Sequence, residues 1–330
     1  MAIGSGLGSQ FGYVAESTYG TRVAATKFLR AKSYSAERTA TRVQGEGIQT
    51  GNFGDLAAHY GETTNAGAGS VAFDVQDRTM GVLLNTLMGG TVTPTLITGS
   101  AYSATFPLAD TLGKSMTVQL GAPYRTGTVR VHELAGVKVT SAEFSCGVGE
   151  FLTCSMDFDA KSWSDSQTLA TASYVGTNVP FNFAQMTLKL GTYASEAAVS
   201  GIRSVNIKID RPHDTEDYTA GSLGTKSEPV LNGATQITGT ISADWLDKAN
   251  FQDRANGTTS TSLVWEFLGT SAISGANYPT FRITVPGVLF EPATQNVDGR
   301  DVLTNDWNFR WSYDGTNQPS IYTVSADTAL

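Results

Sequence analysis

The chain has 330 residues, of which 40% are hydrophobic, 16% are charged and 35 are glycine. This length suffices for two domains with full cores, and the hydrophobic content excludes wholesale disorder. The formal net charge of −8 argues against a protein that grips nucleic acid, because such proteins use clustered lysine and arginine to displace counterions. Few charges with many glycines, serines and threonines are typical of a β-rich protein with many turns.

Membrane and secretion signals are not apparent. No apolar run approaches about 18 residues, so no membrane span is predicted. The first residues lack a basic segment followed by an apolar one, so no signal peptide is expected. The two cysteines, Cys146 and Cys154, flank a turn-like Gly-Val-Gly, and a hairpin there would hold them too far apart for a disulfide. Two reduced cysteines in a β-core, and synthesis in a cytosol, fit best.

The first half of the chain reads as an arm followed by strands and one helix. Residues 1–27 are Gly/Ser-rich at the start and lack apolar periodicity, which predicts an arm that orders against something else. Helical spacing of apolar residues from Met80 to Met88 predicts a helix. The Gly/Thr/Ser-rich residues 89–106 predict a long loop or hairpin. Strands are expected at residues 28–38, 43–48, 69–75, 128–134, 137–145 and 150–160.

The second half begins after a Ser/Thr-rich linker at residues 161–180. Its final strand has aromatic residues at every second position from Trp307 to Tyr313, which is the period of a strand with one apolar face. A short helix is expected to end near Ala255, and residues 316–330 are expected to be a C-terminal tail. The strands expected here are 181–190, 204–210, 236–245, 280–285, 288–293 and 301–313.

These two halves look like copies of one unit. Gly136-Val137 aligns with Gly287-Val288 at a shift of 151, and Gly69-Ser70-Val71 aligns with Gly239-Thr240-Ile241 at a shift of 170. The matches occur in the same order in both halves. The sequence therefore predicts two tandem units, 28–160 and 181–315.

Two aspartates mark the helix of each copy and locate an insertion. Asp77 and Asp247 each precede a predicted helix, where capping explains them better than catalysis. Gly136 follows Asp77 by 59 positions, whereas Gly287 follows Asp247 by 40, so the first copy carries 19 extra residues. We place this insertion in residues 89–106.

Catalytic and metal-binding patterns are missing from the sequence. The three histidines are far apart and follow no metal-ligand spacing. No nucleophile elbow, phosphate-binding loop or zinc-protease motif occurs. We therefore predict no catalytic residue, no cofactor site and no metal site.

Several segments together resemble a known family. Residues 15–21, Ala-Glu-Ser-Thr-Tyr-Gly-Thr, follow a Gly-rich start, and residues 179–183, Val-Pro-Phe-Asn-Phe, lead to the strand at 204–210. With the strand–helix–strand order of each half, these segments resemble the tail tube (major tail) proteins of long-tailed bacteriophages. The resemblance covers most of the chain.

This resemblance implies a fold and an assembly. Tail tube subunits are mainly β, with β-sandwich or barrel-like units that each carry one flanking helix. Rings of six units join long strands into an inner β-barrel around a channel for DNA, and subunits with two tandem units close as homotrimers with pseudo-sixfold symmetry. Rings stack into a tube in the virion tail through loops and terminal arms. The implied partners are other copies of the chain and the tail proteins at the tube ends, while DNA passes without specific binding.

Under this hypothesis the polar strand faces line the channel and the N-terminal aromatic residues reach a neighbouring ring. A negative channel wall would repel DNA phosphates. The channel residues expected from the first copy are Glu143, Asp157 and Asp159. The second copy would supply Asp306 and Asn308. The expected inter-ring contacts are Phe11, Tyr13 and Tyr19.

Three other readings remain open on the sequence. A capsid decoration protein or minor tail component would share this β-rich composition without forming a hollow tube. An enzyme is disfavoured because no catalytic motif occurs. A carbohydrate-binding or adhesin module could use its tryptophans as stacking platforms, namely Trp163, Trp245, Trp265, Trp307 and Trp311.

Overall fold

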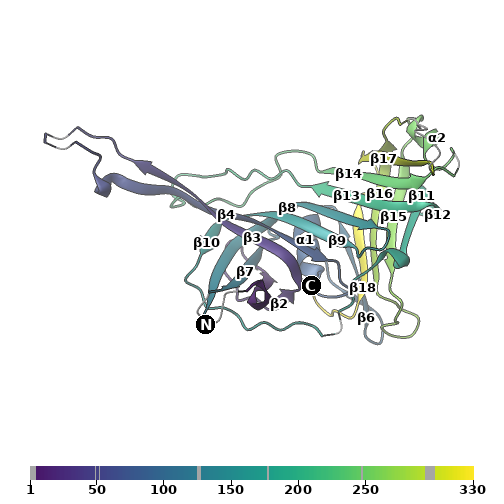
Figure 1. Ribbon diagram of the computed structural model, residues 1–330, viewed down its shortest axis with the longest axis horizontal. Coiled ribbons are helices and arrows are strands. Elements are labelled where there is room, and N and C mark those ends of the chain that lie inside the picture. The colour runs from purple at the N-terminus through teal and green to yellow at the C-terminus, as the bar shows by residue number, and fades with distance from the viewer. Residues whose placement is uncertain are drawn as a thin grey trace.

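The computed structural model describes residues 5–48, 50–51, 53–124, 128–176, 178–246, 248–293 and 302–330. The fold is mainly β, as predicted, and every strand pairing among these residues is antiparallel (Figure 1). The two α-helices are α1 (Gly81–Met88) and α2 (Gln252–Ala255). The strands are β1 (Gln10–Ala15), β2 (Lys27–Leu29), β3 (Ala31–Gln44), β4 (Tyr60–Asp74), β5 (Thr95–Thr98), β6 (Ala101–Pro107), β7 (Met116–Pro123), β8 (Val129–Gly147), β9 (Thr153–Ala160), β10 (Ser162–Ser164), β11 (Met186–Thr192), β12 (Ser195–Ala198), β13 (Ile202–Asp210), β14 (Gln236–Asp244), β15 (Thr261–Leu268), β16 (Thr280–Phe290), β17 (Thr304–Trp311) and β18 (Ser320–Ser325).

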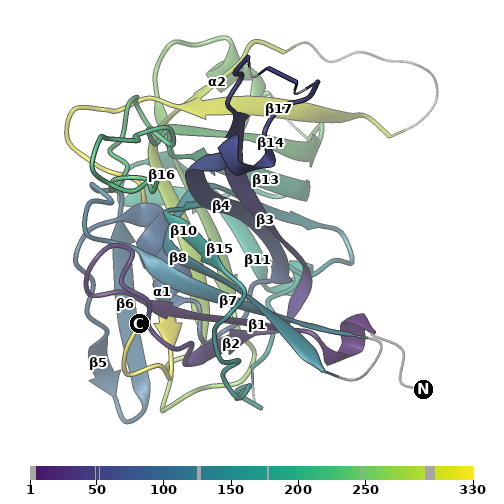
Figure 2. The same ribbon diagram turned by 90° about the vertical axis from the view of Figure 1, so that its left-hand side faces the viewer.

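One sheet runs through both halves of the chain, and we call it the central sheet. Its strands pair in the order β3–β4–β9–β8–β13–β14–β17. The step from the first half to the second is the pairing of β8 with β13, from Ser141↔Asp210 to Gly147↔Ser204. Figure 2 shows β17, β14 and β13 one below the other in this sheet. Backbone hydrogen bonds therefore join the two halves directly.

Two outer sheets pack against the central sheet. The first has the order β2–β1–β7–β8–β10, and the second has the order β12–β11–β15–β16–β18–β6–β5. The long strands β8 and β16 belong to an outer sheet at their N-terminal ends and to the central layer at their C-terminal ends. Each changes layer at a glycine in the left-handed region, Gly136 with φ 67° and Gly287 with φ 75°, a conformation that favours glycine.

This pairing order repeats between the halves. β4 pairs with β9 as β14 pairs with β17, and β7 pairs with β8 as β15 pairs with β16. β10 and β18 each pair with the layer-changing strand of their half. The register Gly69↔Phe158 in the first half corresponds to Gly239↔Phe309 in the second. The alignment by shifts of 170 and 151 therefore reproduces the spatial equivalence of these strands.

The insertion in the first half forms a hairpin. β5 and β6 pair with each other within the range predicted as a loop or hairpin, and β6 also pairs with β18, from Pro107↔Ser320 to Tyr102↔Ser325. The inserted residues of the first copy thus extend the outer sheet of the second. Three strands lie in ranges expected to be irregular: β1 in residues 1–27, β10 in residues 161–180 and β18 in residues 316–330.

The first helix begins without the expected cap. Asp77 lies before the first turn, and its Oδ1 accepts a hydrogen bond from the backbone N–H of Val179 at 2.9 Å. The residue at the start of α1 is Met80, whose side chain caps nothing. Asp77 therefore holds the segment before β11 instead of the helix. Asp247 lies outside the described residues.

The core fills the space between the central and outer sheets. Trp265 of β15, Trp307 of β17 and the apolar face of α1 are buried in it. Phe144 of β8 packs on Phe281 of β16 with ring centroids 5.7 Å apart, which ties the two halves together. Cys146 and Cys154 are buried and free, as expected.

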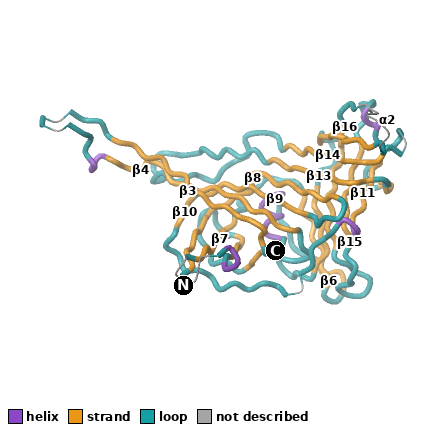
Figure 3. Tube along the Cα trace, viewed as in Figure 1, coloured by secondary structure: helices purple, strands orange, loops and turns teal. Residues whose placement is uncertain are grey.

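The ends of β3 and β4 leave the body of the molecule as a long hairpin (Figures 1 and 3). Arg38 and Arg42 hold Glu62 across the two strands at 2.6 Å and 3.4 Å. Beyond these ion pairs, apolar side chains such as Phe53 and Leu56 are exposed. Exposed apolar side chains on a projecting element are typical of a surface that contacts another protein.

Candidate channel-lining face

The central sheet has one apolar and one polar face. Along β13 the apolar residues Val205, Ile207 and Ile209 are buried, while the residues between them are partly exposed. The same alternation occurs in β14 and β17. The period of two along a strand sends alternate side chains to opposite faces. The polar face is therefore a continuous surface made by both halves of the chain, and we call it the central polar face.

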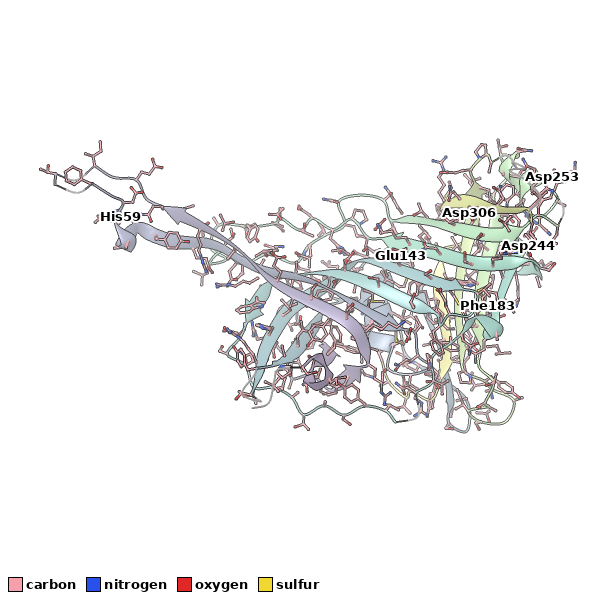
Figure 4. All side chains as sticks on the ribbon, in the orientation of Figure 1. His59, Glu143, Phe183, Asp244, Asp253 and Asp306 are labelled. Carbon is pink, nitrogen blue, oxygen red and sulfur yellow. The ribbon has the colours of Figure 1, made fainter. Side chains whose placement is uncertain are left out.

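Four of the five residues predicted for the channel lie on this face and are exposed. Glu143 is opposite Lys208, Lys208 is opposite Thr238, and Thr238 is opposite Arg310. Asp306 and Asn308 alternate with buried residues in the same strand as Arg310. Asp157 is opposite Ser141, two positions before Glu143. Figure 4 shows Glu143 and Asp306 on the strands of the two halves.

Short polar contacts hold these side chains in place. Asn206 Nδ2 donates a hydrogen bond to Glu143 Oε1, and Ser141 Oγ donates one to Asp157 Oδ2 at 2.9 Å. Among the described residues, Glu143, Asp157 and Asp306 have no ion-pair partner. Other acidic groups on this face are paired, as Asp210 is with Lys208 at 3.0 Å. These three carboxylates outnumber Arg310, which lies on the same face and also has no ion pair among the described residues, so the unpaired charges sum to a negative value.

Asp159, the fifth predicted residue, is buried. Its Oδ1 contacts Lys226 Nζ at 2.5 Å. Burial raises the pKa of this carboxyl group above its usual range, with Lys226 acting in the opposite direction. The covering segment is the connection from β13 to β14, residues 211–235, which we call the strap. Figure 1 shows it running from β13 and β14 toward β4. Asp159 cannot face an open channel while the strap lies on it, which corrects the expectation for this residue.

The strap is held by a cluster of buried polar groups that the sequence did not indicate. Lys138 Nζ contacts Glu228 Oε1 at 2.6 Å, and its pKa is lowered by burial. His213 Nε2 lies 2.8 Å from Thr111 Oγ1, and burial lowers the pKa of His213 to about 4, with the charges of Arg211 and Lys138 adding to this effect. The strap therefore fastens the second half to the first.

The N-terminal aromatic residues are mostly inside the chain. Phe11 and Tyr13 are 1% and 0% exposed on β1, and Tyr13 Oη donates to the carbonyl oxygen of Thr79. A ring buried in its own chain offers no surface to another subunit, so Phe11 and Tyr13 are not available for the inter-ring contacts expected of them. Tyr19 is partly exposed, and the ammonium groups of Lys138 and Lys161 lie 5.6 Å and 5.3 Å from its ring centre.

One edge of the central sheet is open. β3 pairs with β4 along 13 positions, from Ala31↔Phe73 to Gln44↔Tyr60, and its other edge pairs with no strand among the described residues. An open edge presents unpaired backbone donors and acceptors to another chain. At 14 residues, β3 offers a long edge of this kind.

Four of the five tryptophans are buried or packed against another ring or an arginine, and Trp311 is partly exposed with its ring centroid 6.4 Å from that of Tyr313. Trp265 and Trp307 are buried, and Trp245 stacks on Trp307 with ring centroids 6.1 Å apart. Trp163 lies between His132 and Arg38. This arrangement offers little to the carbohydrate-binding reading.

No group of His, Cys, Asp and Glu side chains suited to a metal ion occurs in the part of the chain that the structure describes. In that same part, no helix has the length and apolar character needed to cross a membrane.

Comparison with known proteins identifies the family. No curated protein sequence matches the chain. The profile of a family described as phage tail tube protein matches residues 6–310, nearly the whole length, and so covers both halves of the central sheet. The chain belongs to the phage tail tube protein family.

Proposed function

We propose that this structural tail protein forms rings as a homotrimer with pseudo-sixfold symmetry, and that stacked rings form the tube through which DNA passes. The observation that carries the proposal is the central sheet. It is continuous through both halves, has one exposed polar face, and ends in the open edge of β3.

Ring closure would use that open edge. Adding a strand from a neighbouring chain to β3 would satisfy the free backbone groups along its length. The contact is heterologous, because the edge of β3 meets a different edge of the next chain, and such contacts generate rings when the rotation closes. Two equivalent units per chain would let a trimer present six units around the channel.

The central polar face would then line the channel. Exposed Glu143, Asp157 and Asp306 place carboxylates on this wall, and like charge keeps phosphates from binding tightly. Such a wall favours passage of DNA over retention. Neither a cofactor nor catalysis is part of this role. The remaining partners would be tail proteins at the tube ends, and assembly would follow synthesis in the host cytoplasm.

A reversal of charge on the face tests the channel assignment. We expect tubes of the triple variant Glu143→Lys, Asp157→Lys and Asp306→Lys to retain double-stranded DNA in a co-sedimentation assay, while wild-type tubes release it. Retention should weaken steeply as salt rises, because phosphate binding releases counterions.

A matched triple variant controls for net charge. Asp165→Lys, Asp253→Lys and Asp314→Lys change three exposed acids that lie outside the strands of the central sheet. If this control retains DNA as strongly as the first variant, the central polar face is not the channel wall.

A further inference from the structure

The connection between β3 and β4 and the strap occupy equivalent places in the two halves. A Cβ on Gly69 would lie 2.4 Å from Ser35 O in β3, and a Cβ on Gly239 would lie 2.3 Å from Asn206 O in β13. β3 therefore corresponds to β13 and β4 to β14. Beyond the equivalent pairs Thr39↔Ala66 and Asp210↔Gln236, the two segments have nearly the same length. The first has 26 residues (40–65), which include the outer parts of β3 and β4, and the second has 25 residues (211–235).

These equivalent connections follow different courses. The strap crosses the first half of its own chain, where Lys226 meets Asp159 and Glu228 meets Lys138. Glu228 also accepts a hydrogen bond from the backbone N–H of Gly113 at 2.7 Å. The described residues of the segment 40–65 (40–48, 50–51 and 53–65) instead project from the body as the tip of the β3–β4 hairpin (Figure 1).

The second half has a surface equivalent to the one under the strap. Leu289 pairs with Arg310 in β16 and β17, as Lys138 pairs with Asp159 in β8 and β9. These residues line an open pocket, which we call the acceptor site: Gly257, Thr258, Leu289, Phe290, Glu291, Pro292 and Arg310. Among the described residues, no ion pair reaches Arg310, and no segment lies over this site as the strap lies over Asp159.

We propose that the hairpin tip of a second copy of this chain occupies the acceptor site. The tip joins β3 to β4 in the first half, as the strap joins β13 to β14 in the second half. A ring that joins the second half of one chain to the first half of the next brings the tip to the acceptor site by the same geometry. This inference rests on the proposed ring and names the residues that meet in it.

Charge complementarity identifies the contact. In the strap, Lys226 lies ten positions before Gln236, the first residue of β14, and it pairs with Asp159. Ala66 is the equivalent of Gln236 in the first half. The residue ten positions before it is Leu56, and the neighbouring Asp55 is exposed. Asp55 has no ion-pair partner among the described residues. The two contacts have opposite charge arrangements. Within the chain, Lys226 of the strap pairs with Asp159, and between chains Asp55 of the tip would pair with Arg310.

The neighbouring side chains suit the same contact. Leu56 and Phe53 of the tip are exposed, at 39% and 105%, and the acceptor site offers the apolar Leu289 and Pro292. Covering these side chains between two copies would remove apolar surface from water. The tip therefore offers an acid to Arg310 and apolar side chains to Leu289 and Pro292, while Glu291 also lines the acceptor site.

A charge swap tests the contact. Asp55→Lys and Arg310→Glu each place like charges together, so each should lower the fraction of chain in sedimenting assemblies by about tenfold or more. The double variant Asp55→Lys, Arg310→Glu restores the opposite pair and should restore assembly. Glu46→Lys is the matched control, since it reverses an exposed acid elsewhere on the same tip and should assemble as wild type does. Thermal unfolding of each monomer verifies that the fold is intact.

The outcomes separate this inference from the proposed function. If the wild-type chain assembles and both single variants assemble equally well, the tip does not meet Arg310, while the ring stands. An Asp55→Lys, Arg310→Glu variant that fails as badly as the single variants also overturns the contact, as does an equal defect in Glu46→Lys. A wild-type chain that never assembles would overturn the ring and this contact together.

Discussion

At the residue scale, two glycines show how closely the halves match. Gly69 and Gly239 each lie opposite a phenylalanine, Phe158 or Phe309, whose ring occupies the space of a missing side chain. A Cβ at either glycine would also collide with a backbone oxygen of the next strand. Packing of the central sheet therefore requires glycine at both positions.

Alanine at either glycine should destabilise the protein. Because the colliding atom belongs to the backbone, the sheet must shift, and overpacking of this kind costs about 1 to 3 kcal/mol. We expect Gly69→Ala and Gly239→Ala each to lower the free energy of unfolding by about this amount in urea denaturation.

Gly61→Ala provides the control within the same strand as Gly69. A Cβ there meets nothing within 4 Å, so this variant should leave stability unchanged or raise it slightly. Unaltered stability in Gly69→Ala and Gly239→Ala would mean that the two sites are not packed as described.

The residue scale also shows what sequence could predict. Alternation along β8, β9 and β17 was enough to place Glu143, Asp157, Asp306 and Asn308 on one exposed face. The same alternation put Asp159 there, and it does lie on that side of β9. Its burial depends on Lys226. Because the strap lies far along the chain and has no regular strand, no local pattern indicated this contact.

At the element scale, the strap couples stability to pH. His213 is neutral in the folded chain near neutrality, because burial lowers its pKa to about 4, whereas an unfolded chain titrates it near 6.5. Between these values the unfolded state binds more protons, so His213 lowers stability as pH falls from about 6.5 to 4. Its contribution to the slope reaches at most about 1.4 kcal/mol per pH unit.

The variant His213→Gln removes this proton linkage. We expect its free energy of unfolding to fall less between pH 7 and pH 4.5 than that of the wild type, as measured by denaturant titration. Asp159, whose folded pKa is raised, contributes with the opposite sign in both proteins and cancels in the comparison. His59→Gln, at an exposed position of the hairpin, should keep the wild-type slope; equal slopes in all three proteins would contradict a buried neutral His213.

Elements differed in how well they could be predicted. Helical spacing of apolar residues predicted the first helix. The difference in length between the two halves predicted the inserted hairpin of β5 and β6. Asp77 was expected to cap the helix, but its carboxylate instead accepts a hydrogen bond from the backbone N–H of Val179, which is 102 positions away in the sequence. Strands such as β18 lie in ranges expected to be irregular because short strands with partly exposed faces carry little periodicity.

At the scale of the whole molecule, the two halves repeat one order of strand pairing. Both halves contribute equivalent strands to one sheet, and the insertion in the first half completes the outer sheet of the second. The weak sequence match between the halves predicted this equivalence because the matching positions are those that geometry fixes. Gly136 and Gly287 lie where a strand changes layer, and Gly69 and Gly239 lie against Phe158 and Phe309.

Electron microscopy of the concentrated purified chain, with averaging of end-on views, tests the central claim most directly. The account predicts hollow rings or tubes in which three chains give apparent sixfold symmetry, with the central polar face toward the opening. Compact monomers at every concentration, or filled assemblies without a channel, would contradict it.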